Sequence, residues 1–443
     1  MNISAPFIIS EKEDVSGGGR APDLSLVPTF VVVAVDATGM GIILPLLPFY
    51  SQRLGATPFL VGALVSVYAV CQLVAGPIVG ILSDRNGRRK VLLVSQIGTL
   101  AGFVVLALAP NLTLVFLARI IDGLTSGNIS VAHAYAAEHS TPETRKQALG
   151  ATSGAIGTGL VVGPALSGFL APYGSTAPVW AAAALSLISI LATVALLPPD
   201  ASEPLDLQPI PERKAAWTML GMRYTWSVLA LLIVFFFVNS MFLSQVGLFL
   251  SARFAWNGQA FGARELGWVF AYAGLINIIV QGLLITRANL VASDRSVVVL
   301  AFAGMGAGFC GLTLASGVGL LAVFLTLIIT GFMFARATLT VELSRSAAIN
   351  RQGMIMGFNQ SLMSGANIIA PLISGALIGH RLYFAWGLSM VGLSVSGALL
   401  AAVLLAARYV DGDRQQKGHR SPGNPRGSNG QAGALILIKG QDC

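Results

Sequence analysis

The sequence predicts an all-α protein that spans a membrane twelve times and is built as two six-helix halves. Three observations support this prediction. Hydrophobic residues make up 55% of the 443 residues and charged residues only 10%, long apolar stretches recur along the chain, and the second half repeats small-residue patterns of the first. Because soluble domains carry about 25% charged residues, the composition indicates a lipid environment.

Twelve stretches of roughly 20 apolar residues are each long enough to cross a hydrocarbon layer about 30 Å thick. The predicted spans are 28–50, 59–82, 91–109, 112–135, 147–172, 178–198, 226–250, 266–285, 297–315, 318–342, 354–379 and 387–407.

Polar segments divide this chain into its predicted parts. An arm (1–25) precedes the first half (26–198), a linker (199–225) precedes the second half (226–407), and a tail (408–443) follows. We expect the arm and the tail to be disordered, because neither can bury much apolar surface. The arm is acidic where a cleavable signal would be basic, so we expect the first span to be retained.

A repeat relates the two halves. Residues 150–168 read GATSGAIGTGLVVGPALSG, and residues 357–375 read GFNQSLMSGANIIAPLISG. Both end in P-x-x-S-G, and Gly123 and Gly331 match at almost the same offset. Such a parallel repeat is typical of transporters that bind their substrate between the halves near the membrane midplane.

Basic residues are distributed unevenly between the two sides of the predicted membrane. With a cytoplasmic amino terminus, thirteen of the 27 basic residues fall in inward linkers and four in outward loops. Cytoplasmic loops carry an excess of Lys and Arg, so we expect a plasma-membrane protein with both termini cytoplasmic. The net charge of +8 then reflects topology, and we expect no nucleic-acid partner.

The loop after the second span reads GILSDRNGRRKVLL (80–93). Topology alone requires neither its acid nor its glycine. Gly87 permits a tight turn, and Asp84 is suited to accept hydrogen bonds from the N–H groups at a helix start.

This loop resembles the signature of the major facilitator superfamily. The fifth span resembles the motif of exporters in that superfamily, with Ser167 where a glycine is usual. Residues 35–50 resemble the first helix of drug:proton antiporters, and residues 175–186 resemble the tetracycline-efflux branch. The resemblance implies the major facilitator fold over about residues 26–407.

The resemblance also implies roles for the motif residues. The loop residues would latch the two halves together on the cytoplasmic side, with Glu138 as a partner: Gly80, Asp84, Arg85, Gly87, Arg88 and Arg89. The exporter motif would let the fifth helix bend and pack closely without contacting substrate: Gly150, Gly159, Gly163, Pro164 and Gly168. Gly154 and Gly157 are expected to join that packing.

Three ionisable residues lie deep in the first half, where burying a charge is expensive. Asp36 is in the first span, and Arg119 and Asp122 are i, i+3 neighbours in the fourth. One guanidinium could serve both carboxylates, and we expect Asp36 to carry the exchangeable proton. The alternative is a permanent structural network of all three. Arg336 and Glu342 are expected to reach water at the cytoplasmic end.

Polar residues within spans are candidates to line a substrate cavity, or else to form ordinary interhelical hydrogen bonds. These candidates are Tyr68, Gln72, Asn239, Gln245, Asn277 and Gln281. The aromatic run Phe235–Phe237 offers a surface to an amphipathic drug, although such residues more often pack in the core.

The sequence favours a monomeric, proton-coupled antiporter that exports amphipathic drugs by alternating access, and on the resemblance tetracycline-like compounds come first. Its partners would be a small-molecule substrate and membrane lipid, and the proton gradient would replace any cofactor. An uptake symporter or sugar transporter of the same fold is the alternative.

An enzyme is the remote alternative. It would be an intramembrane hydrolase with Ser153 or Ser167 as nucleophile and His133 as base, but these residues lie on different spans without an orienting acid. The cysteines Cys71, Cys310 and Cys443 are too scattered for a metal or disulfide framework.

Overall fold

The computed structural model describes residues 27–138, 140, 145–197, 223–281, 293–346 and 352–404. The predicted arm and tail, most of the linker and part of the loop after Glu138 lie outside these residues. The helices are α1 (Val27–Arg53), α2 (Pro58–Asn86), α3 (Arg88–Ala107), α4 (Leu112–Thr125), α5 (Asn128–Glu138), α6 (Arg145–Leu170), α7 (Ala177–Leu196), α9 (Arg223–Arg253), α10 (Ala263–Ile279), α12 (Asp294–Leu314), α13 (Val318–Arg345), α14 (Gln352–Gly379) and α15 (Tyr383–Leu404).

The all-helical membrane fold is confirmed. Eleven helical stretches of the described chain are long and apolar enough to cross a membrane, when α4 and α5 are counted together. The remaining predicted span, 266–285, corresponds to α10, whose 17 residues end at Ile279, while the described part of this segment ends at Gln281. The protein is therefore a multi-pass membrane protein.

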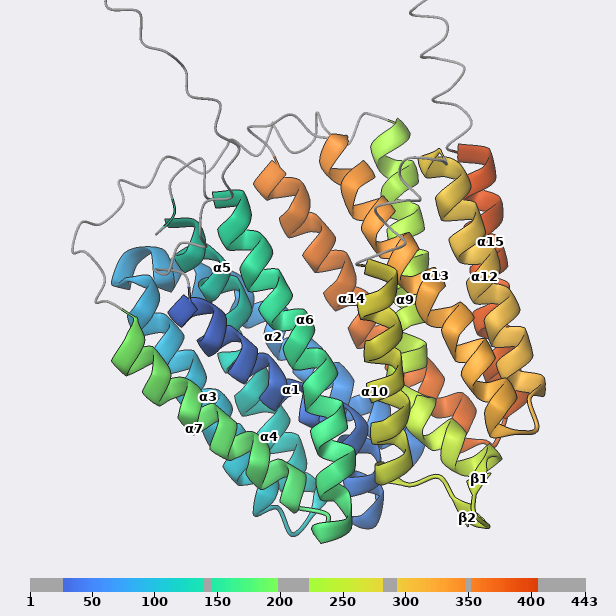
Figure 1. Cartoon of the computed structure of the whole chain (residues 1–443), viewed down its shortest axis with the longest axis horizontal. Helices are drawn as coiled ribbons and strands as arrows, with labels where there is room; N and C mark the ends of the chain where they lie inside the picture. Colours follow the sequence, from blue (N-terminus) through green and yellow to red (C-terminus); the bar gives the residue numbers. More distant parts are fainter. Residues whose placement is uncertain are drawn as a thin grey trace, which may run out of the picture.

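The helices form two groups that face each other (Figure 1). Helices α1 to α7 make up one group, and α9, α10 and α12 to α15 make up the other. The groups meet mainly where α2 packs on α14 and where α6 packs on α10. We call the end of the bundle that carries the β1–β2 hairpin the hairpin end, and the opposite end, where α1 begins and α15 ends, the termini end.

The groups touch closely at the hairpin end. The Ser66 hydroxyl of α2 donates a 2.7 Å hydrogen bond to the Ile368 carbonyl of α14, and the Gly62 backbone lies directly against Pro371. On the other side of the interface, a Cβ on Gly168 of α6 would lie 2.8 Å from Gly267 of α10.

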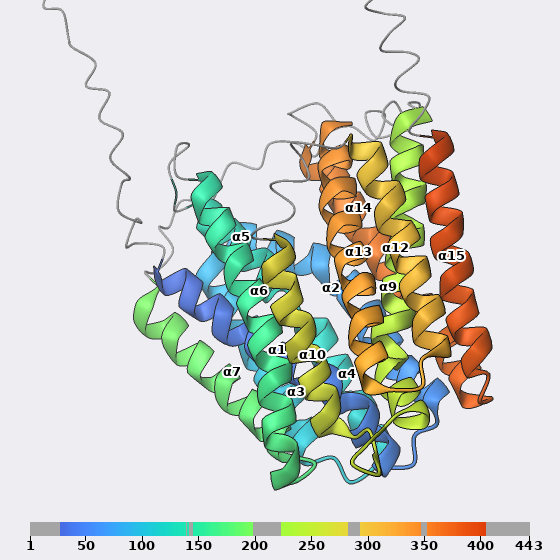
Figure 2. The ribbon, with the colours of Figure 1, turned by 45° about the vertical axis from the view of Figure 1, so that its right-hand side comes forward.

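The groups stand apart at the termini end, where Figure 2 shows the ribbons of α6 and α14 diverging. Within the described chain, a Cβ added to Gly76 or Gly80 of α2, or to Gly357 of α14, would meet no atom within 4 Å. A cavity occupies the space between Gly76 and Gly357. The structure is thus closed at the hairpin end and open at the termini end.

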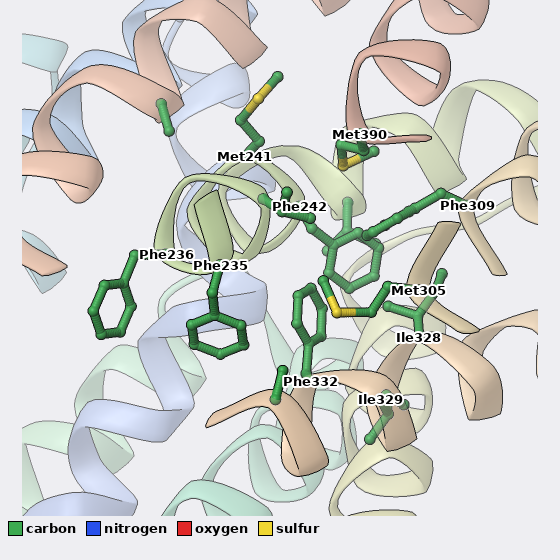
Figure 3. Close-up of a cluster of buried hydrophobic side chains, with 14 of the residues drawn as sticks. Phe235, Phe236, Met241, Phe242, Met305, Phe309, Ile328, Ile329, Phe332 and Met390 are labelled. Carbon is green, nitrogen blue, oxygen red and sulfur yellow. The ribbon is translucent and has the colours of Figure 1, made fainter. Parts of the chain in front are cut away.

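An aromatic core holds the second group together (Figure 3). Phe332 of α13 lies 5.9 Å from Phe235 of α9 and 6.1 Å from Phe309 of α12, ring centre to ring centre. Phe235 and Phe236 are buried at 2% and 6% exposure. The suggestion that this aromatic run offers a drug surface is therefore wrong for Phe235 and Phe236, which pack inside their own group.

Two local features depart from the expected architecture. The fourth predicted span is broken at Ser126 and Gly127, where the Ser126 backbone leaves the helical conformation with a ψ of 105°. Gly127 packs directly against Val79 of α2, so a side chain has no room there. A short hairpin, β1 (Ala255–Trp256) with β2 (Gln259–Ala260), follows α9. Its turn is Asn257-Gly258, both at positive φ, a pair that favours tight hairpins.

Candidate functional site

Three charged side chains are buried near the middle of the first group. Asp36 of α1 and both Arg119 and Asp122 of α4 are less than 8% exposed. Their burial is costly unless each charge is compensated. Such residues in a spanning helix are functional candidates, as the sequence predicted.

Arg119 and Asp122 form an ion pair within α4. Nη2 of Arg119 lies 3.0 Å from Oδ2 of Asp122, because residues three apart share one helix face. The guanidinium carbon also lies 5.5 Å from the centre of the Tyr68 ring of α2, within cation–π range. These contacts compensate the arginine from two helices.

Asp36 has a neutral partner instead. Nδ2 of Asn128, the first residue of α5, donates a 2.8 Å hydrogen bond to Oδ2 of Asp36. Oδ1 of Asp36 has no hydrogen-bond partner within the described residues, and no ion pair joins Asp36 to Arg119 there. The expectation that one guanidinium serves both carboxylates is therefore wrong in this conformation, since of the two acids only Asp122 pairs with Arg119 in the described chain.

Sequence reasoning missed Asn128. In the continuous fourth span that the sequence predicted, Asn128 is an ordinary residue in the middle of a helix. In the structure the helix breaks just before Asn128, which becomes the first residue of α5 and binds Asp36. The Ser126-Gly127 pair inside an apolar span was the available signal, because such pairs are frequent causes of kinks.

Two cavities lie next to these residues. The deeper one, of about 390 Å³, lies between the two groups and is lined by Tyr68, Arg119, Asp122 and Asn239 among others. The second, of about 250 Å³, is lined by Asn128 and opens toward the termini end. Met40 of α1 lines both. Asp36, four residues before Met40 on α1, accepts the hydrogen bond of Asn128, which lines the second cavity.

The six candidate cavity residues do not lie together in one cavity. Tyr68 and Asn239 line the deeper cavity, and Gln72 lines the second one. Gln245 is fully buried and donates a 3.0 Å hydrogen bond to the Pro58 carbonyl at the start of α2.

Asn277 and Gln281 pair with each other along α10. None of Asn277, Gln281 and Gln245 lines either of these two cavities. Both halves supply polar side chains to the two cavities, with Tyr68 and Gln72 from the first half and Asn239 from the second.

The small residues of α6 pack against α1. A Cβ on Gly159 would lie 2.6 Å from Ala37 and the Thr38 nitrogen, and one on Gly163 would lie 2.5 Å from the Thr38 carbonyl. Pro164 packs beside Gly41.

The termini-end half of α6 is different. A Cβ added to Gly150, Gly154 or Gly157 would meet no atom of a neighbouring helix within 4 Å among the described residues. The expected close packing at Gly154 and Gly157 is thus not present in this conformation, because the groups have separated there.

The loop between α2 and α3 is braced from both sides. Gly87 turns the chain at φ 94°. Arg88 forms an ion pair with Asp84 and donates a 2.6 Å hydrogen bond to Ser83. Arg89 donates a 2.7 Å hydrogen bond to the Val194 carbonyl in the last turn of α7, where cations are favoured.

The contacts of Arg88 and Arg89 with Asp84, Ser83 and Val194 all lie within the first group. The side chain of Glu138, the predicted latch partner, lies outside the described part. Gly80 and Arg85 lie on the last turns of α2.

The remaining charged residues of the spans behave differently from one another. Glu342 is 2% exposed and lies 3.0 Å from Arg345, so the expectation that it reaches water is wrong. Arg336 is exposed, as expected.

Ser167 and His133, two residues of the hydrolase alternative, do not form a catalytic pair. Ser167 is fully buried on α6, and its hydroxyl has no hydrogen-bond partner among the described residues. Nε2 of His133 on α5 likewise has none. A nucleophile and its base need hydrogen-bond reach. The side chain of Ser153 lies outside the described part.

The family follows from the sequence comparison. The profile of the Major Facilitator Superfamily matches residues 29–371. The chain belongs to the Major Facilitator Superfamily. The matched residues include the buried charged cluster, the loop after α2 and the packed half of α6. These features therefore occur in a transporter fold.

Curated members of this superfamily are similar over most of the chain. The class H tetracycline resistance protein of Pasteurella multocida is 27% identical over 87% of this chain and 96% of its own length. The class C tetracycline resistance protein of Escherichia coli is 28% identical over 86% and 96%. Multidrug resistance protein 2 of Bacillus subtilis (strain 168) is 27% identical over 82% and 92%.

Solved structures confirm the fold at lower identity. The nucleoside transporter NupG superposes with a TM-score of 0.74 at 13% identity, over 86% of this chain and 99% of that one. The human organic anion transporter MFSD10 (TETRAN) gives 0.64 at 19% identity, over 86% and 100%. The Major Facilitator architecture is thus common to transporters of different substrates.

Proposed function

We propose that this superfamily member is a proton-coupled antiporter that exports amphipathic drugs, with tetracycline-like compounds as the leading class. The observation that carries the proposal is the buried Asp36 carboxyl, which has a neutral amide partner and, among the described residues, no ion-pair partner. The similarity to tetracycline and multidrug resistance proteins supports the substrate class.

The arrangement separates two electrostatic roles. The Arg119–Asp122 pair is compensated internally and can stay charged throughout. Asp36 is uncompensated, so the empty site favours its neutral, protonated form, since burial disfavours an isolated charge. A cationic group entering from the cavity stabilises the ionised form, and the proton then leaves.

Alternating access links this exchange to direction. With both termini in the cytoplasm of the plasma membrane, the open termini end faces the cytoplasm and the closed hairpin end faces outward. The drug would enter from the cytoplasm, and closure at the termini end would precede release. We propose that a monomer performs this cycle, using the proton gradient and no cofactor.

The test uses inside-out membrane vesicles that contain the full chain. Tetracycline, a lipophilic cation and a sugar are offered under an imposed pH gradient. Accumulation of the first two, abolished by a protonophore, is the expected result. Accumulation of the sugar alone, or transport in the opposite direction, would contradict the proposal and favour the metabolite-transport alternative.

A further inference from the structure

A groove at the hairpin end is not part of the transport site. It has a volume of about 480 Å³ and lies between the first turns of α10 and α13, under the β1–β2 hairpin. Aromatic rings from the hairpin and α10 line one part of it, and Arg264 and Glu265 lie beside them. Apolar side chains of α13 line the rest.

The groove faces lipid rather than the space between the groups. On α10, Gly267 and Gly274 pack against α6, and Tyr272 bonds to Thr326 of α13. Trp268 and Leu275, seven residues apart on another face, are more than half exposed. An exposed apolar face on a spanning helix meets the bilayer.

The depth of the groove matches the boundary between headgroups and acyl chains. It begins at the hairpin, beside Trp256, and continues along α13 from Val318 to Leu325, about 10 Å at 1.5 Å per residue. Headgroup layers are about 5–7 Å thick on each side of the hydrocarbon. Tryptophan is enriched at this level, where its ring meets both phases.

Charges of both signs lie at the polar end of the groove. Arg264 is exposed, and its guanidinium has no hydrogen-bond or ion-pair partner within the described residues. One oxygen of Glu265 accepts a 2.9 Å hydrogen bond from the Gly262 N–H and caps α10. Its other oxygen is without a partner in the described chain. The indoles of Trp256 and Trp268 are more than half exposed nearby.

We propose that this groove binds one zwitterionic phospholipid. Arg264 would bind the phosphate, because guanidinium groups pair well with phosphate oxygens. Glu265 and the indole rings would bind the ammonium group, through charge and cation–π attraction. An acyl chain would lie along Val318, Leu321 and Leu325. The site stands apart from the proposed export function, and only its assignment to the outer leaflet rests on the proposed orientation.

The experiment is native mass spectrometry of the purified full chain with a short-chain phosphatidylethanolamine, in competition with phosphatidylglycerol. The wild type should retain one phosphatidylethanolamine in preference to phosphatidylglycerol. Arg264→Ala should bind it at least fivefold more weakly. Arg53→Ala, which removes an exposed arginine at the same end of the bundle, should bind it like the wild type.

A second variant tests the ammonium contact without removing the helix cap. Glu265→Gln keeps an oxygen for the Gly262 N–H, since glutamine also serves in capping boxes. It should lose the preference for phosphatidylethanolamine and keep its thermal unfolding midpoint.

Three outcomes would overturn the proposal. The first is that Arg264→Ala binds phosphatidylethanolamine as tightly as the wild type does. The second is that the wild type binds the two lipids equally. The third is that the lipophilic cation tetraphenylphosphonium occupies the groove and phosphatidylethanolamine does not displace it.

Discussion

Asn128 holds Asp36 through a 2.8 Å hydrogen bond, so a deep acid that has no cationic partner among the described residues is positioned by a neutral amide. This amide begins α5, whereas the Arg119–Asp122 pair belongs to α4. The break at Ser126 and Gly127 therefore places the proposed proton carrier's partner and the permanent ion pair on two separate helical pieces.

Replacing Asp36 by asparagine should abolish uphill, pH-driven efflux and leave downhill exchange or drug binding measurable. The side chain keeps its shape but can no longer take up or release a proton. Efflux and exchange would be measured in the same vesicles. Full proton-coupled efflux in Asp36→Asn would refute the assignment, and failure to fold would favour the structural network.

Removing the Asn128 amide should shift the pH dependence of efflux. The amide is the hydrogen-bond partner of Asp36 in the described chain, so its loss should change how efflux depends on pH. The pH of half-maximal efflux should shift by about one unit, the equivalent of a charged hydrogen bond of about 1.5 kcal/mol. Ser130→Ala, in the same cavity, should leave the pH profile unchanged. An unshifted Asn128→Ala profile would show that the bond does not tune the proton step.

A leucine at Gly163 should reduce transport and stability. The added side chain would meet the Thr38 carbonyl and Gly41 at 2.5–2.8 Å, and overpacking costs about 1–3 kcal/mol. Gly392→Leu is the matched control, because a Cβ there meets no described atom within 4 Å. Transport per inserted protein and the unfolding midpoint would be compared. Equal tolerance at both sites would mean that α6 and α1 do not pack at Gly163.

Loosening the loop between α2 and α3 should impair transport without changing drug affinity. Asp84→Asn and Arg88→Ala each remove the ion pair that spans the turn. Because an exposed ion pair contributes up to about 1 kcal/mol, we expect transport about fivefold lower. Lys90→Ala is the charge-matched control. Normal transport by both variants would exclude a role of this pair in the cycle.

The spans could be predicted because crossing a bilayer requires length and apolarity, both readable without knowing any contact. The buried charges could be predicted for the same reason, since Asp36, Arg119 and Asp122 interrupt apolar runs. Their pairing could not be predicted, because it depends on the break before Asn128, which a hydropathy profile smooths over.

The packing of α6 could not be predicted, because it depends on the conformation of the protein. The glycines of α6 look alike in sequence, yet a Cβ would clash with α1 at Gly163 and meet no neighbouring helix at Gly157, because the two groups meet at one end only. The β1–β2 hairpin could have been predicted, because its Asn257-Gly258 pair is typical of a tight hairpin turn.

The contacts that close the hairpin end determine how sensitive this closure is to pH and salt. It is made by main-chain atoms, with Gly62 against Pro371 and Gly168 against Gly267, and by a neutral serine hydroxyl. None of these groups changes charge with acidity, and contacts between neutral atoms are not weakened by dissolved ions, unlike exposed ion pairs. In the proposed orientation this end is the outer gate, and its closure would then be insensitive to the acidity and the salt content of the external medium.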